Sequence, residues 1–273
     1  MYVRIAVVVI VVLVICVLVF WYTFGTSTKN DQTVQPPRGN ITVKNPYVPN
    51  QDIAWVENDF TVANWPNTFD FDFDIKKHIV DMAITFPQKS CIIDCGAHIG
   101  DGSIAIAMAL KHHNREDVVV YAIEPSKEKC SFIQKVVDKN HITNLKIIQH
   151  GLSDKIGIYI PKPLPQDSLN TGGTNWELDP SPMQNNPNGI DFTMLDHLVE
   201  TGQITHTIQY IHLDVEGMEI NALRGATHVL QTHVPTYLSI EEWTNDTTIP
   251  NFLKTMGYQY TTRLGSNNIY TRM

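Results

Sequence analysis

The sequence has little positive charge. It contains 20 lysine and arginine residues against 28 aspartate and glutamate residues, which gives a formal net charge of −8. A protein that follows the phosphate backbone of RNA or DNA needs a basic face. No run of like charge supplies one here. We therefore expect no nucleic-acid partner, and RNA methylation or other nucleic-acid chemistry is disfavoured.

Cysteine is also scarce. Of the four cysteines, Cys16 lies in an apolar segment, which leaves Cys91, Cys95 and Cys130. No second C-x-x-C pair and no histidine cluster accompanies them, so the sequence does not predict a zinc site. We interpret these thiols as small buried hydrophobic side chains.

Residues 5–24 contain no charge at all. Twenty helical residues at about 1.5 Å each span the roughly 30 Å of a bilayer core. Trp21 and Tyr22 stand at one end, where aromatic rings prefer the headgroup level, and the apolar stretch exceeds the roughly 7–15 residues of a signal peptide. We predict an uncleaved single-pass anchor over residues 1–24, in contact with the lipid bilayer through residues 5–24. The short N-terminal tail favours a domain on the lumenal or extracellular side, although the flanking positive charges are nearly balanced.

Changes in composition divide the chain into three regions, of which the anchor is the first. Residues 25–72 begin as a polar, proline-containing stretch and are predicted to be a linker or stalk that leads into the domain. From residue 73 to 273, helical periodicity alternates with short apolar runs, which is typical of an α/β domain with a mostly parallel sheet covered on both faces. The two last runs resemble a hairpin, which places an antiparallel C-terminal strand at or near the sheet edge. The expected helices cover residues 75–86, 103–113, 126–140, 218–233 and 248–258, and the expected strands cover 90–94, 117–125, 144–153, 208–217, 236–243, 258–264 and 267–273. Residues 189–200 are expected to form a short strand and then a helix.

Residues 161–190 interrupt this alternation with many prolines and asparagines. A long segment without regular structure inside a compact domain is commonly a functional lid. Trp176 lies within it, and two interpretations remain open. The indole could stack on a substrate ring, or it could pin the loop to the domain.

A glycine-rich turn follows the first strand of the domain, in "CIIDCGAHIGDGS" (residues 91–103). Its glycines are spaced G-x-x-x-G-x-G, which lacks the G-x-G-x-x-G of dinucleotide sites. Asp94 at the strand end would also repel a pyrophosphate resting on the following helix. S-adenosylmethionine carries a sulfonium and an ammonium, so the same acid would attract it. Glu124, which closes the next strand, is placed to accept both ribose hydroxyls. The turn therefore predicts S-adenosylmethionine rather than NAD.

Several blocks of the sequence resemble, in order and at familiar intervals, those of FkbM-type S-adenosylmethionine-dependent methyltransferases. They are "IIDCGAHIGDGS", "AIEPSKEKCSFI", "GLSDKIG", "TMLDHL", "IHLDVEGMEINALRGA" and "YLSIEEW". The resemblance covers about residues 75–273 and implies a Rossmann-like methyltransferase sheet. It also implies methylation of hydroxyl oxygens on sugars or polyketide-like products. The matching positions imply cofactor contacts with the methionine moiety through Asp94, Gly96, Ala97, His98 and Gly100, with the ribose through Glu124, and with the adenine through Ser153 and Asp154.

One position departs from the family pattern. A lysine commonly precedes the aspartate of the D-x-E-G block by two residues, and here that residue is His212. On a strand, His212 and Asp214 point to the same side, and a neutral histidine can accept a proton near pH 7. The candidate catalytic residues are Asp214, His212 and Glu241, in that order. A divalent metal near Asp214 and Glu241 stays open, since hard cations bind carboxylates. Asp196 is interpreted as ordering its helix.

The sequence thus predicts a membrane-anchored O-methyltransferase that uses S-adenosylmethionine. The expected acceptor is a small molecule or glycan, most specifically a hydroxyl of a glycan or glycolipid, because a membrane tether keeps the domain beside surface carbohydrate. The alternative is a decayed methyltransferase fold that serves as a membrane-tethered binding or structural protein. Decay would remove the glycines or acids first, and these are present.

Overall fold

The computed structural model describes residues 42–55, 72–162, 176–180, 189–242 and 246–273. Residues Arg38–Met273 belong to one compact unit. Within the described ranges, no helix combines the length and apolar character needed to cross a bilayer. The predicted anchor at residues 1–24 lies outside these ranges, as does most of the predicted linker.

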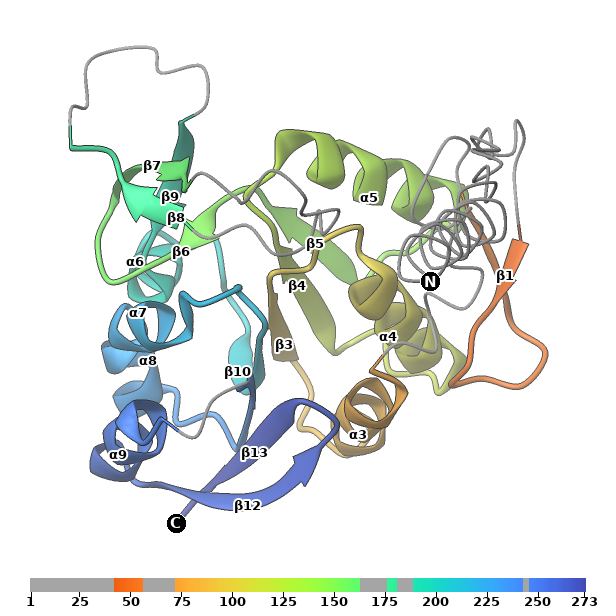
Figure 1. Ribbon diagram of the computed structural model, residues 1–273. Coiled ribbons are helices and arrows are strands. Elements are labelled where there is room, and N and C mark those ends of the chain that lie inside the picture. The colour runs from red at the N-terminus through yellow and green to blue at the C-terminus, as the bar shows by residue number, and fades with distance from the viewer. Residues whose placement is uncertain (1–41, 56–71, 163–175, 181–188, 243–245) are drawn as a thin grey trace, which may run out of the picture. The chain divides into compact units, whose positions relative to one another are not determined.

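A seven-stranded sheet organises the domain (Figure 1). Its strand order is β12-β13-β11-β10-β3-β4-β5. All neighbours pair in parallel except β13, which is antiparallel to both β11 and β12. The predicted mixed α/β sheet with a closing hairpin at one edge is therefore confirmed. The strands are β3 (Ser90–Cys95), β4 (Val119–Ile123), β5 (Leu145–Ile148), β10 (Thr207–Leu213), β11 (Tyr237–Glu241), β12 (Tyr258–Leu264) and β13 (Asn267–Arg272).

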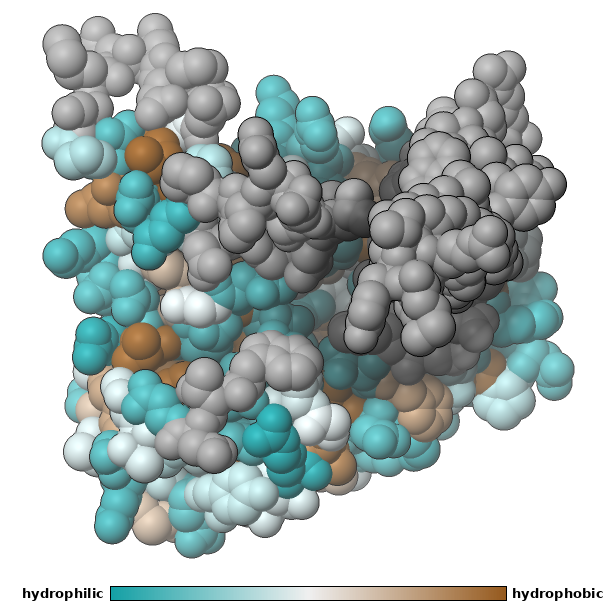
Figure 2. Space-filling model, in the orientation of Figure 1, coloured by the Kyte–Doolittle hydropathy of each residue, from teal (hydrophilic) through white to brown (hydrophobic). Residues whose placement is uncertain are grey.

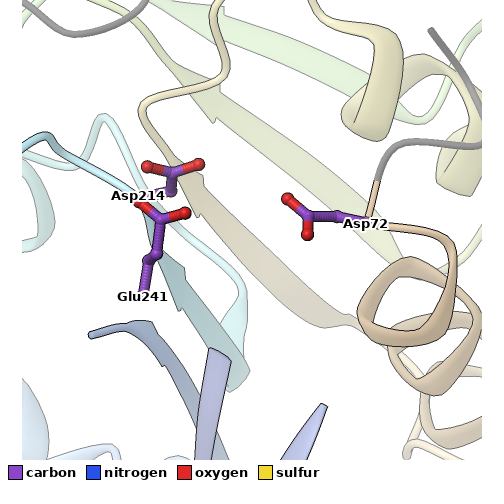
Figure 3. Close-up of side chains that lie close together, drawn as sticks. All are labelled: Asp72, Asp214 and Glu241. Atoms are coloured by element: carbon purple, nitrogen blue, oxygen red, sulfur yellow. The ribbon is translucent and has the colours of Figure 1, made fainter. Parts of the chain in front are cut away.

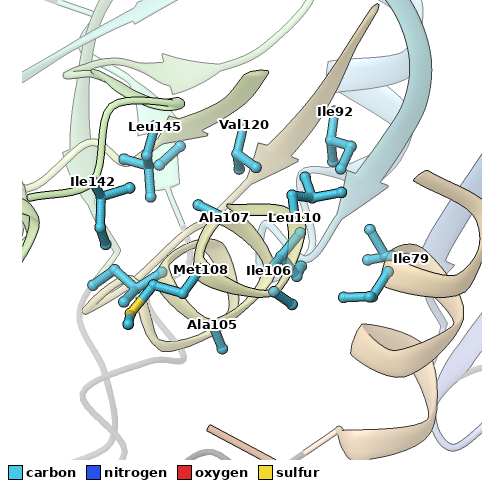
Figure 4. Close-up of a cluster of buried hydrophobic side chains, with 14 of the residues drawn as sticks. Ile79, Ile92, Ala105, Ile106, Ala107, Met108, Leu110, Val120, Ile142 and Leu145 are labelled. Atoms are coloured by element: carbon cyan, nitrogen blue, oxygen red, sulfur yellow. The ribbon is translucent and has the colours of Figure 1, made fainter. Parts of the chain in front are cut away.

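Helices cover both faces of this sheet, which explains why every residue of the central strands β3 and β4 is buried. Alternate residues point to opposite sides, so Ile92 packs with one group of helices and Ile93 with the other. Figure 4 shows Ile92, Val120 and Leu145 facing the helices of the first group. That group is α3 (Phe73–Ala83), α4 (Asp101–His112) and α5 (Lys127–Lys139), and the second is α6 (Leu195–Glu200), α7 (Glu219–Arg224), α8 (Thr227–Thr232) and α9 (Thr248–Thr255).

A second, four-stranded sheet follows β5, with the order β6-β9-β7-β8. The stretch predicted as one strand over residues 144–153 is in fact split, because β6 leaves the main sheet and pairs with β9. The exposed apolar side chains of Ile156 and Leu178 belong to this region, and Figure 2 shows brown at this corner of a largely hydrophilic face. The strands are β6 (Gly151–Leu152), β7 (Gly157–Pro161), β8 (Trp176–Leu178) and β9 (Ile190–Thr193).

Trp176 begins β8, inside the segment predicted to be an irregular loop. Its ring centroid lies 5.6 Å from that of Phe192. Phe192 in turn stacks on Tyr159 at 4.2 Å. Of the two interpretations of Trp176, the structure favours the one in which the indole attaches this segment to the domain. Residues 163–175 and 181–188 of the predicted loop lie outside the described ranges.

Residues 42–55 form a hairpin of β1 (Thr42–Lys44) and β2 (Asp52–Ala54). The sequence places them in the linker, yet Ile53 and Trp55 are fully buried. Trp55 packs against Phe132 of α5 at 5.5 Å, and the backbone of Ala54 exchanges two hydrogen bonds with the Asn140 amide, each 2.8 Å long. This hairpin is therefore part of the domain, which begins earlier than residue 73.

The helix predicted over residues 218–233 is two helices, α7 and α8. They separate at Gly225, where a Cβ atom would lie 2.0 Å from the Ser153 carbonyl oxygen. The Asp196 carboxylate accepts hydrogen bonds from the His228 and Val229 backbone N–H groups, at 2.9 and 2.8 Å. Asp196 thus orders a helix as predicted, but that helix is α8 and not its own.

Candidate active site

The order of the strands reverses between β3 and β10. From β3 the chain continues to β4 and β5 on one side, and it returns to β10 and β11 on the other. In open α/β sheets, ligands bind at the carboxyl ends of the strands beside such a switch point. Here Asp94 pairs in register with His212, and His212 with Ser239. These three side chains therefore lie in one row, on the sheet face covered by α3 and α4.

The glycine turn is held by the neighbouring strands. The Gly96 and Ala97 N–H groups both donate to the Ile123 carbonyl oxygen, at 2.9 and 3.0 Å. Gly96 has a φ of +85°, and a Cβ atom there would lie 1.8 Å from the Asp214 carbonyl oxygen. Gly96 therefore allows the close approach of two backbone segments, and its implied contact with the methionine moiety stays a prediction. Gly100, with a φ of +80°, caps the start of α4.

Replacing Gly96 with alanine should destabilise the domain by about 4 kcal/mol or more, because the methyl group meets backbone that cannot move aside. Gly202 provides the matched control. Its φ is also positive, at +73°, but nothing lies within 4 Å of its Cβ position. Gly202→Ala should cost only the backbone strain, about 1–2 kcal/mol. Urea unfolding of both variants measures the difference, and equal losses would contradict the close contact with Asp214.

Two acids flank this turn. Asp94 is buried and accepts a hydrogen bond from the Ser103 hydroxyl in α4. Glu124 is also buried, and its carboxylate accepts the His98 and Ser126 backbone N–H groups, each at 3.0 Å. Burial raises the pKa of Glu124, and the Lys129 ammonium and these N–H groups oppose the rise. The structure therefore brings together the predicted acids and the predicted turn.

Ser153 and Asp154 lie at the end of β6. The Ser153 hydroxyl forms a 2.7 Å hydrogen bond with the Tyr159 hydroxyl, and its N–H donates to the Thr193 carbonyl oxygen at 2.9 Å. These described contacts tie Ser153 to the second sheet rather than to the glycine turn. The predicted adenine contacts of both residues stay predictions.

Three carboxylates converge at the carboxyl ends of β10 and β11 (Figure 3). Asp214 follows β10, Glu241 ends β11, and Asp72 reaches toward them from the N-cap of α3. One carboxylate oxygen of each lies within 4.8 Å of the others. The sequence interpretation missed Asp72, which stands in the alternating run "FDFDFD" that leads into α3. The neighbouring sequence does not distinguish Asp72 from Asp70 or Asp74 as a site residue.

The comparison with known families identifies the family of this chain. The family model for the methyltransferase FkbM domain matches residues 94–260, which include Asp94, Glu124, His212, Asp214 and Glu241. The chain belongs to the FkbM methyltransferase family. The resemblance in its motifs is therefore confirmed, and the domain that the chain carries is a methyltransferase domain.

Solved structures with a similar fold include an FkbM methyltransferase from Methylobacillus flagellatus. It is 16% identical over 80% of this chain and 63% of that chain, with a TM-score of 0.44. M. capricolum TrmK in complex with S-adenosylhomocysteine is 12% identical over 70% and 65% of the two chains, with a TM-score of 0.39. The Streptococcus mutans protein SMU.1697c, also in complex with S-adenosylhomocysteine, is 10% identical over 73% and 95%, with a TM-score of 0.41. This chain thus spans less than two thirds of the first two proteins. No curated protein matches its sequence.

The carboxylate cluster gives this FkbM methyltransferase an unusual charge state. Burial, the charge of Glu241 and a hydrogen bond with Glu241 raise the pKa of Asp214 to about 9. Burial also raises the pKa of Asp72, against the attraction of the Lys76 ammonium. At neutral pH, Asp214 is therefore protonated and hydrogen-bonded with Glu241. A carboxyl group that already carries a proton cannot accept a second one from a substrate, so the catalytic role that the sequence predicts for Asp214 stays a prediction.

His212 differs from its acidic neighbours because it can accept a proton. Its ring is buried, and burial lowers its pKa, although the charges of Asp94 and Asp72 raise it in part. The ring is therefore neutral near pH 7. Its Nδ1 atom forms a 2.8 Å hydrogen bond with the Ser239 hydroxyl, which leaves Nε2 as the nitrogen available to a reacting group.

Two further acids near these strand ends have other hydrogen-bond partners. Glu242 is buried and accepts a 2.8 Å hydrogen bond from the Tyr270 hydroxyl. Glu219 accepts the Val215 and Gly217 N–H groups, at 3.2 and 3.1 Å, at the start of α7. The divalent metal that the sequence leaves open near Asp214 and Glu241 stays a prediction, and Asp72 would be its third carboxylate ligand.

Proposed function

We propose that the protein transfers the methyl group of S-adenosylmethionine to a hydroxyl oxygen of a glycan or glycolipid. The observation that carries this proposal is the row formed by Asp94 and His212. It places an acid suited to a cationic methyl donor beside a neutral base, at the switch point of the sheet. A family of methyltransferases supplies the reaction class.

The cofactor would lie over the glycine turn. Asp94 attracts the ammonium and sulfonium of the donor, and Glu124 keeps acceptor capacity for the ribose hydroxyls beyond the two N–H groups that it binds. Ala97, His98 and Gly100 complete the turn around the methionine moiety. Ser153 and Asp154 are the proposed adenine contacts, next along the carboxyl edge after β5.

The chemical step forms two bonds, oxygen–carbon and nitrogen–hydrogen, and breaks two, carbon–sulfur and oxygen–hydrogen. The acceptor oxygen attacks the methyl carbon, the carbon–sulfur bond breaks, and S-adenosylhomocysteine leaves, while the hydroxyl proton passes to Nε2 of His212. Positioning of the two substrates supplies about 7–11 kcal/mol in well-oriented cases, and a general base adds about 10²- to 10⁴-fold. The charge of Asp94, and to a lesser degree those of Asp72 and Glu241, then stabilises the imidazolium, since these charges raise the pKa of His212.

We expect a bell-shaped dependence of kcat/KM on pH. On the acid side the rate falls as His212 gains a proton, and because its pKa is lowered from 6.5, this fall lies below pH 6.5. On the alkaline side the rate falls near pH 9, where Asp214 loses its proton and adds a second negative charge beside Glu241. Rates measured from pH 5 to 10 test this profile. Asp214→Asn should remove the alkaline fall, and an unchanged fall in that variant would contradict the assignment.

The acceptor and the membrane location are proposed on separate grounds. The uncharged residues 5–24 support an anchor in the bilayer, with the domain on the lumenal or extracellular side. The net charge of −8 disfavours nucleic acid. Exposed Ile156 and Leu178 on the second sheet offer an apolar surface that suits a lipid-linked sugar.

A transfer assay tests the proposed function. S-adenosylmethionine with a tritiated methyl group is incubated with the protein and a panel of oligosaccharides and glycolipids. We expect label in an alkali-stable ether of one carbohydrate. Label that appears only in protein or in lipid without sugar would contradict the acceptor class. Tight S-adenosylhomocysteine binding without transfer to any acceptor would favour a decayed fold with a binding role.

A further inference from the structure

We propose that Ser239 is a positioning residue for His212. In this arrangement, the Nδ1–H group of His212 donates to the Ser239 hydroxyl oxygen, so the lone pair of Nε2 faces the acceptor hydroxyl. The inference rests on the proposed function for its catalytic meaning, but the ring tautomer can be measured without any reaction.

The geometry fixes the pair firmly. Ser239 is fully buried at the centre of β11, and its hydroxyl oxygen lies 2.8 Å from Nδ1 of His212 in the adjacent strand. The two residues are register partners of parallel strands, so both side chains leave the same sheet face. The ring therefore cannot turn away without leaving a buried hydroxyl without its partner, which costs about 1–3 kcal/mol.

The charges around the ring do not by themselves choose the tautomer. Asp94, Asp72 and Glu241 raise the pKa of His212, whereas Lys76 lowers it. Lys76 comes from α3 and forms a 2.6 Å ion pair with Asp101 at the start of α4. These groups surround the imidazole from α3, α4, β3 and β11. The acids attract an N–H group on either ring nitrogen. The 2.8 Å contact with Ser239 involves Nδ1 alone, so this contact is what distinguishes the two nitrogens.

A second buried hydroxyl lies near this pair. Tyr210 precedes His212 by two residues on β10, so its ring lies on the same face. The Tyr210 hydroxyl oxygen is buried and has no hydrogen-bond partner among the described residues. In the proposed arrangement, Ser239 accepts from the imidazole and turns its own proton toward this oxygen, which leaves Nε2 unprotonated.

The first test reads the tautomer directly. The protein is labelled with ¹⁵N-histidine, and the His212 ring signals are assigned by their loss in His212→Gln. We expect a neutral ring near pH 7.5 with the proton on Nδ1. In Ser239→Ala, the ring should become a mixture of both tautomers. A proton on Nε2 in the unaltered protein would overturn the proposal.

The second test measures catalysis. Ser239→Ala should lower kcat about tenfold and leave the Kd for S-adenosylhomocysteine within about twofold. Combined with His212→Ala, it should add no further loss, since its effect passes through the ring. Losses that multiply would overturn the proposal. Ser239→Thr, which keeps the hydroxyl, should restore most of the rate.

Ser90→Ala is the matched control. Ser90 is equally buried in β3, but its hydroxyl donates to the Pro87 carbonyl oxygen at 2.6 Å, at the opposite end of the strand. Its kcat should stay unchanged. If the tautomer is as expected and no acceptor is ever methylated, the proposed function fails while the role of Ser239 in orienting the ring stands.

Discussion

Replacing His212 with alanine is expected to lower kcat by about 10²- to 10⁴-fold, the usual contribution of a general base. The ring is buried and neutral because burial lowers its pKa. It stands at the carboxyl end of β10, between Asp94 and Ser239. The Kd for S-adenosylhomocysteine should change by less than about threefold, because the ring acts on the acceptor proton and not on the donor.

Asp214→Asn is the informative comparison. Since the pKa of Asp214 is raised to about 9, the side chain already carries a proton at pH 7. An asparagine keeps a hydrogen-bond donor toward Glu241, so kcat at pH 7 should fall by less than about tenfold. Single-turnover rates at saturating donor measure both variants. A large loss in Asp214→Asn together with a small loss in His212→Ala would make the carboxylate the base and contradict our assignment.

Replacing Asp94 with asparagine is expected to weaken S-adenosylmethionine binding by about 10- to 150-fold. The substitution removes a buried negative charge but keeps the volume and an oxygen that accepts from Ser103. Hydrogen bonds to charged groups contribute about 1.5–3 kcal/mol, which corresponds to this range. Titration calorimetry with S-adenosylmethionine and S-adenosylhomocysteine gives the loss for each ligand.

Ser103→Ala separates charge from packing at the same place. It removes the hydrogen bond that Asp94→Asn keeps and leaves the Asp94 carboxylate, so its effect on cofactor affinity should be at most about threefold. A larger loss in Ser103→Ala than in Asp94→Asn would mean that Asp94 only fastens α4 to β3. In that case the acid would have no direct part in binding the cofactor.

Local signals in the sequence were sufficient to predict the glycine turn and its acids. The apolar run of β3, the glycines and the start of α4 follow one another within a few residues, so a strand, a tight turn and a helix can be predicted from this one stretch. Glu124 could be placed because it closes the next parallel strand, and strand ends meet at one edge of the sheet.

Tertiary contacts decided the features that the sequence did not reveal. Asp72 joins Asp214 and Glu241 only because α3 packs beside the carboxyl edge, and no motif links these three segments. The break between α7 and α8 depends on the close approach of Gly225 to Ser153, which follows β6 of the second sheet. The proposal that His212 rather than Asp214 accepts the proton likewise rests on the closeness of Asp214 and Glu241, which their spacing along the chain does not report.

Titration of S-adenosylhomocysteine into the protein tests the central claim most directly. We predict saturable binding of one molecule per chain, with a micromolar Kd that rises markedly in Asp94→Asn. The absence of heat and of any thermal shift with either S-adenosylhomocysteine or S-adenosylmethionine would contradict the assignment of the glycine turn, Asp94 and Glu124 as a cofactor site.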